Sequence, residues 1–449
     1  MKIPLFSLVL LIVSAINSIR NLPTTAFFGG SLIFYCLLAA LFFLIPVSLI
    51  SAEFASRFPT QGGIFHWIRH AFGPRAGLLA VWLQWINTMV WYPSMLLFIA
   101  GTTAYLINPA LAENKTFLLL TTLTIFWGLT LINLKGIQVS TRINSYSGTL
   151  GTLLPITLLI ILGLGWFLFG NPSPLTFSTH LDNSSALISI IASFLGMELA
   201  GVHINDIENP QKNFPKAIAY SVLILLSTLI LGSLSIAIVM PPDQIHFIDG
   251  VMQTFTTFFH TLRLPFLIPL LALLIIIGSI GGSINWLLSP AKGLLQAAQH
   301  HFLPPFFLAQ NRHQVSVRIL ITQAILVSTL CLILTLIPSI NAFYWFLLSL
   351  STALYMLMYI LLFLAALKLK RPSHSYRIPR GLRTPAILLG LLSCALTILI
   401  GFLPPSHVPI QSPLLYTLTI ALGLTLLTAP VLLLWAYQSR RKRHLSPQI

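Results

Sequence analysis

Long apolar segments separated by short polar loops constrain this chain more than any other feature. A helix needs about 20 mostly apolar residues to cross a membrane, and twelve segments have that length and character. Because lipid-exposed backbone must satisfy its own hydrogen bonds, these segments predict an all-α polytopic membrane protein. The predicted spans cover residues 5–28, 31–53, 77–106, 117–134, 146–169, 185–204, 217–240, 265–290, 317–337, 342–367, 384–404 and 414–437.

The charged residues exclude a soluble globule and indicate an orientation. Only 7% of the 449 residues are charged, against about 25% in soluble domains. The formal net charge is +16, but the basic residues lie in short loops, so we expect no nucleic-acid partner. With twelve spans, 21 of the 24 Lys and Arg residues fall on the side of the termini. The positive-inside rule therefore predicts cytoplasmic termini in the plasma (bacterial inner) membrane.

Two charged residues lie deep inside predicted spans, each at an interruption of the helical pattern. Arg20 lies in the polar segment 17–23, which ends in a proline, and Glu198 lies between Gly196 and Gly201. A charge at mid-membrane costs roughly 2.5–3.5 kcal/mol unless it is paired or hydrated. Broken helices are tolerated at that depth only where they line a cavity or are buried in protein. Breaks in the first and sixth spans therefore predict a five-plus-five inverted repeat with a central binding site.

The predicted domain organisation follows from the spans and the repeat. No loop is long enough to form a separate soluble domain. We expect a single transmembrane transporter domain over 1–449, with repeats at 1–170 and 185–368, two further helices at 384–437 and a short cytoplasmic tail at 438–449.

The two deep charges have two interpretations. They form a mutual salt bridge that only holds helices together, or they handle substrate and protons, which we favour because both lie at breaks. Glu53 lies near the cytoplasmic end of its span, so we expect it to reach water in an interfacial or capping role.

Candidate site residues come from the breaks and from polar or aromatic residues that can face them. Free backbone groups at a break suit the carboxylate and ammonium of a ligand. We predict Glu198 as the proton-coupling residue and no catalytic residue. The predicted substrate-binding residues are Ser18, Ile19, Arg20, Asn21, Asn87, Phe194, Gly196, Gly282, Trp286 and Tyr355.

Several short sequence stretches resemble those of a known family. They are Ser51-Ala52-Glu53, Gly62–Trp67, Gly196-Met197-Glu198, His203–Pro210, Ser289–Leu294 and Tyr376–Pro379. In order and spacing along the chain they resemble the amino acid–polyamine–organocation (APC) superfamily, and within it the bacterial glutamate/γ-aminobutyrate antiporters. The resemblance implies a LeuT-like fold that exchanges amino acids for their decarboxylation products, or proton-coupled amino acid uptake.

The chain departs from that group at three places. The small-residue break typical of the superfamily is replaced by Ser18–Asn21, and the acidic residue of the glutamate antiporter in the eighth helix corresponds to Gly282. The long C-terminal extension that plugs that antiporter does not follow Tyr437. Together with Arg20, these departures favour a neutral or acidic amino acid and argue against plug-gated glutamate exchange.

Other function classes find less support in the sequence. An intramembrane enzyme would need a motif such as His-Glu-x-x-His or Gly-x-Ser-x-Gly, and the chain has neither. A channel or receptor stays open as an alternative, although a receptor would need a soluble output region. The three cysteines, Cys36, Cys331 and Cys394, show no zinc or disulfide spacing. We therefore expect a secondary amino acid transporter with no cofactor or metal, whose partners are an amino acid, an amine or amino acid counter-substrate, protons and lipid. Homo-oligomerisation stays open.

Overall fold

The computed structural model describes residues 2–58, 63–135, 147, 149–170, 172–173, 175, 177, 187–300, 302–313, 315–337, 339–371, 376–405 and 412–444. Within them the chain is helical, with two isolated bridges and no longer strand. The α-helices are α1 (Leu5–Ile16), α2 (Leu22–Ala26), α3 (Leu32–Ala39), α4 (Ile45–Arg57), α5 (Ile64–Phe72), α6 (Pro74–Ala104), α7 (Lys115–Leu134), α9 (Leu154–Phe169), α10 (Leu187–Ala192), α11 (Pro210–Ala237), α12 (Gly250–Thr261), α13 (Leu267–Gln299), α14 (Val317–Leu332), α15 (Ile340–Lys368), α16 (Arg380–Gly401) and α17 (Pro413–His444).

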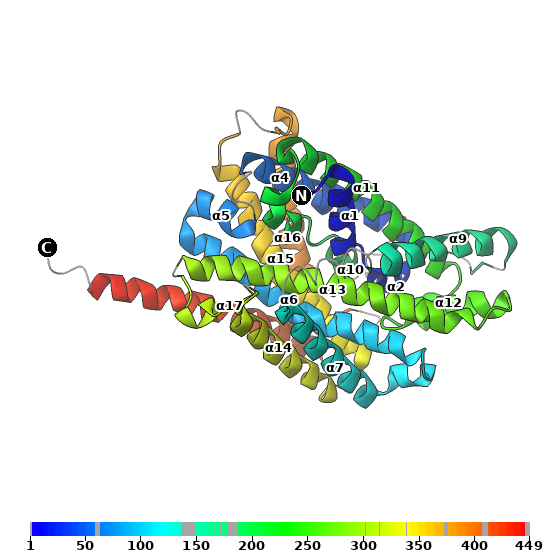
Figure 1. Cartoon of the computed structure of the whole chain (residues 1–449). Coiled ribbons are helices and arrows are strands. Elements are labelled where there is room, and N and C mark those ends of the chain that lie inside the picture. The colour runs from blue at the N-terminus through cyan, green and yellow to red at the C-terminus, as the bar shows by residue number, and fades with distance from the viewer. Residues whose placement is uncertain are drawn as a thin grey trace.

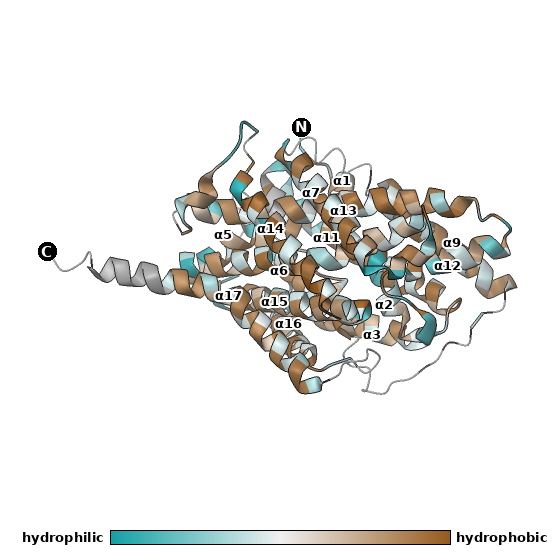
Figure 2. Cartoon of the chain, turned by 90° about the horizontal axis from the view of Figure 1, so that it is seen from below, coloured by the Kyte–Doolittle hydropathy of each residue, from teal (hydrophilic) through white to brown (hydrophobic). Residues whose placement is uncertain are grey.

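The long helices form one bundle whose sides are apolar. Figure 1 shows α13, α15 and α11 running in broadly the same direction, with α9 and α12 at the end of the bundle away from the C-terminus. Helix α6 packs most extensively against α13 and α15, so it lies at the centre of the bundle. Hydrophobic residues dominate the helices in Figure 2, as expected for surfaces that face lipid.

Nine helices of the described residues are long and apolar enough to cross a membrane, or ten if the bent pair α1 and α2 counts as one span. They correspond to ten of the twelve predicted spans. The third, 77–106, is a helix of 31 residues, α6, which is not among the nine because polar and tryptophan residues lower its mean hydropathy. At 185–204 the described chain forms only the six-residue α10 and a 3-10 helix, η7 (Leu199–Asp206). The number of twelve stays a prediction.

Parts of the sequence-based predictions lie outside the described residues. They include Gly62 of the family motif, residues 146 and 148 of the fifth predicted span, 185–186 of the sixth, and residues 445–449 of the predicted tail.

The first predicted span is bent where its sequence turns polar. Helix α1 ends at Ile16, and Asn17 and Ser18 adopt extended backbone angles. A short 3-10 helix, η1 (Ile19–Asn21), leads into α2, where Pro23 lies at the first turn and lacks only an amide that would be free there anyway. The two helical pieces are inclined by 42°. The bend turns the carboxyl end of α1 and the side chain of Arg20 into the interior of the bundle.

Glycine allows two backbones to touch near this bend. A π-helical turn, η5 (Thr149–Leu153), precedes α9. A Cβ on Gly151 would lie 2.2 Å from the Gly278 nitrogen of α13, and a Cβ on Gly278 would lie 2.1 Å from the Gly151 carbonyl carbon. No side chain fits at either position, so the two elements pack through their backbones, as small residues permit in membrane bundles.

The predicted interfacial role of Glu53 is wrong. Its side chain is fully buried and forms an ion pair with Arg383 of α16, with Arg383 Nη2 3.0 Å from Oε1. Arg383 Nη2 also donates to the carbonyls of Ala366 and Leu369 at the end of α15. Helices α4, α15 and α16 converge here, so a charge that the sequence places at a membrane surface is covered by protein.

Candidate functional site

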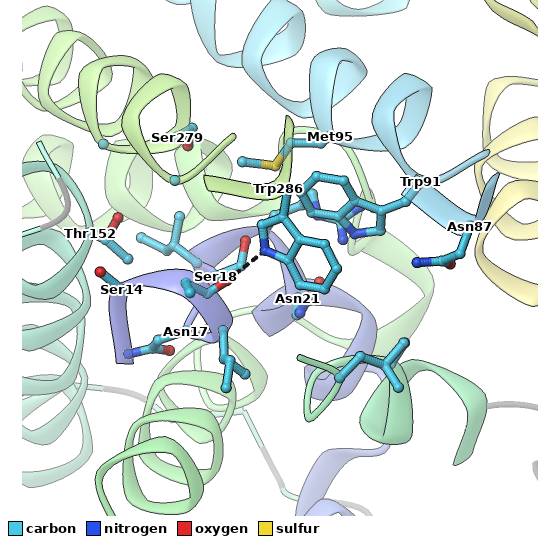
Figure 3. A pocket seen from close by; sticks show the side chains of 18 residues that line it. Ser14, Asn17, Ser18, Asn21, Asn87, Trp91, Met95, Thr152, Ser279 and Trp286 are labelled. Atoms are coloured by element: carbon cyan, nitrogen blue, oxygen red, sulfur yellow. Dashed lines mark hydrogen bonds between the residues drawn. The ribbon is translucent and has the colours of Figure 1, made fainter. Parts of the chain in front are cut away.

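A narrow cavity lies where the bend between α1 and α2 faces α6 and α13 (Figure 3). Its volume is about 40 Å³, room for roughly three water-sized spheres. The polar and aromatic residues of its lining are Ser14, Asn17, Ser18, Arg20, Asn21, Asn87, Trp91, Thr152, Ser279 and Trp286. Four separated chain segments, the bend, α6, η5 and α13, therefore supply one small polar space inside an apolar bundle.

Among the described residues, Arg20 is the only charged one that lines this cavity. It is 2% exposed. Its Nη1 donates to Ser94 Oγ at 2.6 Å, and its guanidinium lies 5.0 Å from the centroid of the Trp91 ring. Its Nε has no hydrogen-bond partner among the described residues. The guanidinium is therefore held by a hydroxyl and an aromatic face. Its Nε–H has no partner, and no carboxylate of the described residues pairs with it.

Two further buried polar atoms of the lining lack partners in the described structure. They are the Oδ1 atom of Asn87 and the Nδ2 atom of Asn17. Buried polar groups are nearly always hydrogen-bonded, so such atoms require an explanation. Arg20 Nε and Asn17 Nδ2 are donors, as a carboxylate requires, and Asn87 Oδ1 is an acceptor, as an ammonium requires.

Trp286 connects the bend to α6 and to the segment after α10. Its Nε1 donates to the Ala15 carbonyl at 2.7 Å, near the end of α1. Its ring stacks on Trp91, with centroids 5.2 Å apart, and Figure 3 shows the two indoles side by side. A Cβ on Gly196 would lie 2.9 Å from the Trp286 ring, and Gly196 has a φ of +105°, a conformation that favours glycine. The Gly196 turn and the ring thus fit closely together.

Glu198 belongs to a neighbouring group of polar residues. It is 1% exposed. Its Oε1 accepts from Gln84 Nε2 at 2.8 Å and from Tyr355 at 2.5 Å, and its Oε2 accepts from the hydroxyl of Tyr359 at 2.5 Å. Tyr359 also accepts from the Gly196 amide at 3.0 Å. Helices α6 and α15 therefore supply three donors to one buried carboxylate in the non-helical segment after α10.

A segment between α11 and α12 adjoins the Arg20 side of the cavity. Its Phe247 ring lies 6.3 Å from that of Tyr344, whose ring also contacts the Arg20 guanidinium at 5.9 Å. Asp249 accepts from the Tyr105 hydroxyl at 2.8 Å and pairs with His246 Nδ1 at 3.2 Å. The hydrogen bond to Asp249 raises the pKa of His246, against the opposing effect of partial burial. This segment is thus tied to α6 beside the cavity.

The structure divides the predicted site residues into two groups. The cavity brings together Ser18, Ile19, Arg20, Asn21, Asn87, Gly282 and Trp286. Phe194, Gly196, Glu198 and Tyr355 do not line it; Gly196 and Tyr355 contact the ring of Trp286, and Tyr355 binds Glu198.

The interpretation that Arg20 and Glu198 form a mutual salt bridge is wrong. Arg20 binds Ser94 and two aromatic faces, whereas Glu198 binds Gln84 and two tyrosines. No ion pair joins the two charges in the described part of the chain. Each charge is therefore buried with neutral partners of its own.

The predicted site residues do not include Trp91, Ser94 and Tyr359, which the structure places beside them. Trp91 lies four residues after Asn87 on α6, and Ser94 follows Trp91 by three, so all three share one face. Tyr359 is related to Tyr355 in the same way. Among the described residues, no group of three His, Cys, Asp or Glu side chains could hold a metal ion.

The sequence matches one family model and several known transporters. The sequence profile of the family described as amino acid permease matches residues 3–426. An uncharacterized transporter of Legionella pneumophila is 39% identical over 98% of this chain and 97% of its own length. A glutamate/gamma-aminobutyrate antiporter of Lactococcus lactis is 30% identical over 91% of this chain and 85% of its own. A probable agmatine/putrescine antiporter of that species is 25% identical over 82% and 80%.

The family match covers the bend, the cavity and the Glu198 group together. The relatives are named transporters or antiporters rather than enzymes. The resemblance to the APC superfamily is confirmed. The chain belongs to the amino acid permease family of that superfamily and is a secondary amino acid transporter.

Proposed function

We propose that this protein exchanges amino acids across the bacterial inner membrane by alternating access around the cavity at Arg20. The proposal includes twelve spans in a LeuT-like five-plus-five inverted repeat, with broken first and sixth helices and cytoplasmic termini. It is supported by the 42° bend at Asn17–Ser18, by the short helices around Glu198 and by the basic loops. Broken helices near the midplane are the usual place of substrate in such repeats.

The substrate is a neutral or acidic amino acid. The observation that carries this proposal is the buried Arg20 guanidinium. Among the described residues it has no acidic neighbour in the cavity, and its Nε has no partner. A guanidinium matches a carboxylate geometrically and electrostatically. Gly282 adds no negative group for an amine. We therefore favour the glutamate type of substrate named for two of the relatives over the diamine type named for another. The counter-substrate is a second amino acid or its decarboxylation product.

Binding requires movement, because about 40 Å³ does not hold an amino acid. Trp286 is the side chain best placed to move. It fills the space between α1 and Trp91 and is held to Ala15 by a single hydrogen bond. A rotation of its ring, together with a shift of the Gly196 turn that packs against it, would enlarge the cavity beside Arg20 and Asn87.

Glu198 is proposed to couple protons to exchange. It is a buried carboxylate one residue beyond the Gly196-Met197 turn, and its hydrogen bonds to Tyr355 and Tyr359 link it to α15. A change in that segment on substrate binding would change which donors it meets, and so its affinity for a proton. Glu198→Gln should lower exchange or flatten its pH profile, whereas Glu113→Gln, the same change at an exposed site, should not. Wild-type rates and pH dependence in Glu198→Gln would restrict Glu198 to a structural role.

The substrate proposal is tested by counterflow in proteoliposomes. Vesicles preloaded with an unlabelled amino acid should accumulate the labelled one without ATP. Glutamate, glutamine and γ-aminobutyrate should compete better than lysine, arginine or putrescine. Arg20→Gln should raise the KM for the preferred acidic substrate at least tenfold and weaken the exclusion of cations. Arg318→Gln, which removes an exposed arginine outside the cavity, is the control and should change neither. Tight transport of a diamine by the unmodified protein would overturn the proposed selectivity.

A further inference from the structure

A second cavity lies at the end of α13 and the start of α14, apart from the Arg20 cavity. Its volume is about 330 Å³, within the usual size range of ligand pockets. None of its residues lines the first cavity. One wall is a single stripe of α13, because its residues follow at intervals of three and four. The lining residues are Leu288, Ala291, Lys292, Leu295, Gln299, Gln310, His313, Val315, Ser316 and Leu320.

The polar half of this cavity is suited to an anion. Lys292 lines it, and its ammonium forms no hydrogen bond or ion pair with any described residue. No acidic side chain of the part of the chain that the structure describes lines the cavity, and the sequence contains no Asp or Glu after Asp249. Ser316 is the N-cap of α14 but caps no amide, so its hydroxyl is free to donate, and a helix N-terminus adds positive potential.

The loop that forms the other wall is held in place by its own hydrogen bonds. Gln310 and Ser316 form an isolated antiparallel bridge. The Asn311 amide donates to the Val315 carbonyl at 3.0 Å. Asn311 Nδ2 donates to the Leu134 carbonyl at the end of α7 at 2.6 Å. The cavity is therefore built before any ligand enters.

The remaining lining is apolar, and α14 carries exposed apolar side chains beyond it. Leu288, Leu295 and Leu320 form this half. Next to them on α14, Ile321 is 38% exposed and Ile325 is 54% exposed. A ligand that satisfies both halves carries a negative group joined to a hydrophobic part. Basic pockets between membrane helices bind the headgroups of anionic lipids in this way.

We propose that this cavity binds an anionic phospholipid, with the phosphate at Lys292 and Ser316 and the glycerol and first methylenes against the leucines. The site lies at the end of the bundle that carries Arg312 and Arg318, where positive side chains attract anionic headgroups. It is independent of the Arg20 cavity, so its failure would leave the proposed exchange activity untouched.

The test is lipid binding by the purified protein, measured by native mass spectrometry. The probes are dioctanoyl-phosphatidylglycerol, dioctanoyl-phosphatidylcholine and soluble glycerol 3-phosphate. The anionic lipid should bind at least tenfold more tightly than either of the others. Lys292→Gln should weaken that binding about tenfold. Lys292→Arg should keep it within threefold, which shows that the site tolerates substitution when the charge stays. Gln299→Trp changes no charge but fills the rim of the cavity, and should also weaken binding of the anionic lipid.

The control is Lys212→Gln, which removes an exposed lysine at the start of α11 and should change binding less than twofold. Equal losses in Lys212→Gln and Lys292→Gln would mean attraction by diffuse surface charge and would overturn the site. Glycerol 3-phosphate that binds as tightly as the anionic lipid would overturn the lipid as ligand in favour of a soluble phosphate. Phosphatidylcholine that binds as tightly as phosphatidylglycerol would show that the site does not select a net negative charge, and would overturn the anionic lipid as its ligand.

Discussion

Removing one partner of the Glu53–Arg383 ion pair should destabilise the protein more than replacing both partners. Arg383 Nε lies 3.0 Å and 3.3 Å from the two Glu53 oxygens. The side chains of Glu53 and Arg383 are 0% and 11% exposed, so water does little to screen the pair. Glu53→Ala would leave a buried guanidinium whose remaining partners, within the described ranges, are the carbonyls of Ala366 and Leu369.

The expected loss follows from that geometry. Breaking a buried ion pair by removing one partner costs about 3–5 kcal/mol. We expect the lower end, about 3 kcal/mol, because Arg383 keeps two carbonyl acceptors. Glu53→Gln keeps one acceptor oxygen and should lose about 2 kcal/mol, as for a hydrogen bond to a charged group. Glu53→Leu combined with Arg383→Met should lose about 1 kcal/mol or less, since apolar replacement of both partners is often neutral.

The assay is chemical unfolding of the detergent-solubilised protein, with the free energies compared in a double-mutant cycle. Glu113→Ala, the same truncation at an exposed acid, is the control and should stay within about 0.5 kcal/mol of the wild type. The reasoning is refuted if Glu53→Ala is as stable as that control. It is also refuted if the double replacement is no more stable than the single one, because the cost would then come from lost packing.

Three further predictions concern the contacts around the cavity. Gly278→Ala should lower the free energy of unfolding by about 1–3 kcal/mol through overpacking against Gly151, whereas Gly381→Ala, which has open space around it, should not; equal unfolding curves would contradict the contact. The raised pKa of His246 means that its pair with Asp249 stabilises the protein fully below the unfolded-state pKa of about 6.5 and loses that contribution as the pH rises through the higher folded pKa. His246→Gln should therefore lower the melting temperature at pH 5.5 and have less effect at pH 8.5, and the opposite order would refute it. Tyr359→Phe removes one donor to Glu198 and should alter the pH dependence of exchange at unchanged folded yield, which counterflow at several pH values measures.

Most of the fold prediction rests on the lengths of the apolar segments and on the polar residues and proline that interrupt them. Ten of the predicted spans correspond to helices or a bent pair that can cross a membrane. The bend at Asn17 and Ser18 falls where polar residues precede Pro23. Both signals are local, so one sequence suffices to read them. The predicted residues of the bend, with Asn87, Gly282 and Trp286, line one cavity because they lie near these interruptions.

The partners of the buried charges could not be predicted in the same way. Glu53 meets a residue that follows it by 330 positions, and no local pattern encodes such a contact. Arg20 and Glu198 have opposite charges and lie at similar predicted depth, yet each binds neutral side chains of α6 or α15. Which faces of packed helices meet depends on their rotation and tilt, which hydropathy does not specify.

The claim that the Arg20 cavity is the substrate site is tested most directly by substrate protection of a single cysteine. The native Cys36, Cys331 and Cys394 are buried and can be replaced by alanine. Ser18→Cys then introduces one thiol into the lining, and Thr261→Cys, at the exposed end of α12, is the control.

In proteoliposomes, the exchanged amino acid should slow the reaction of Cys at position 18 with a small water-soluble maleimide at least fivefold, with half-protection at its KM. A non-transported amino acid should give no protection, and labelling at position 261 should not change. Unaltered labelling at position 18 under saturating exchange would show that the substrate binds elsewhere and would contradict the account.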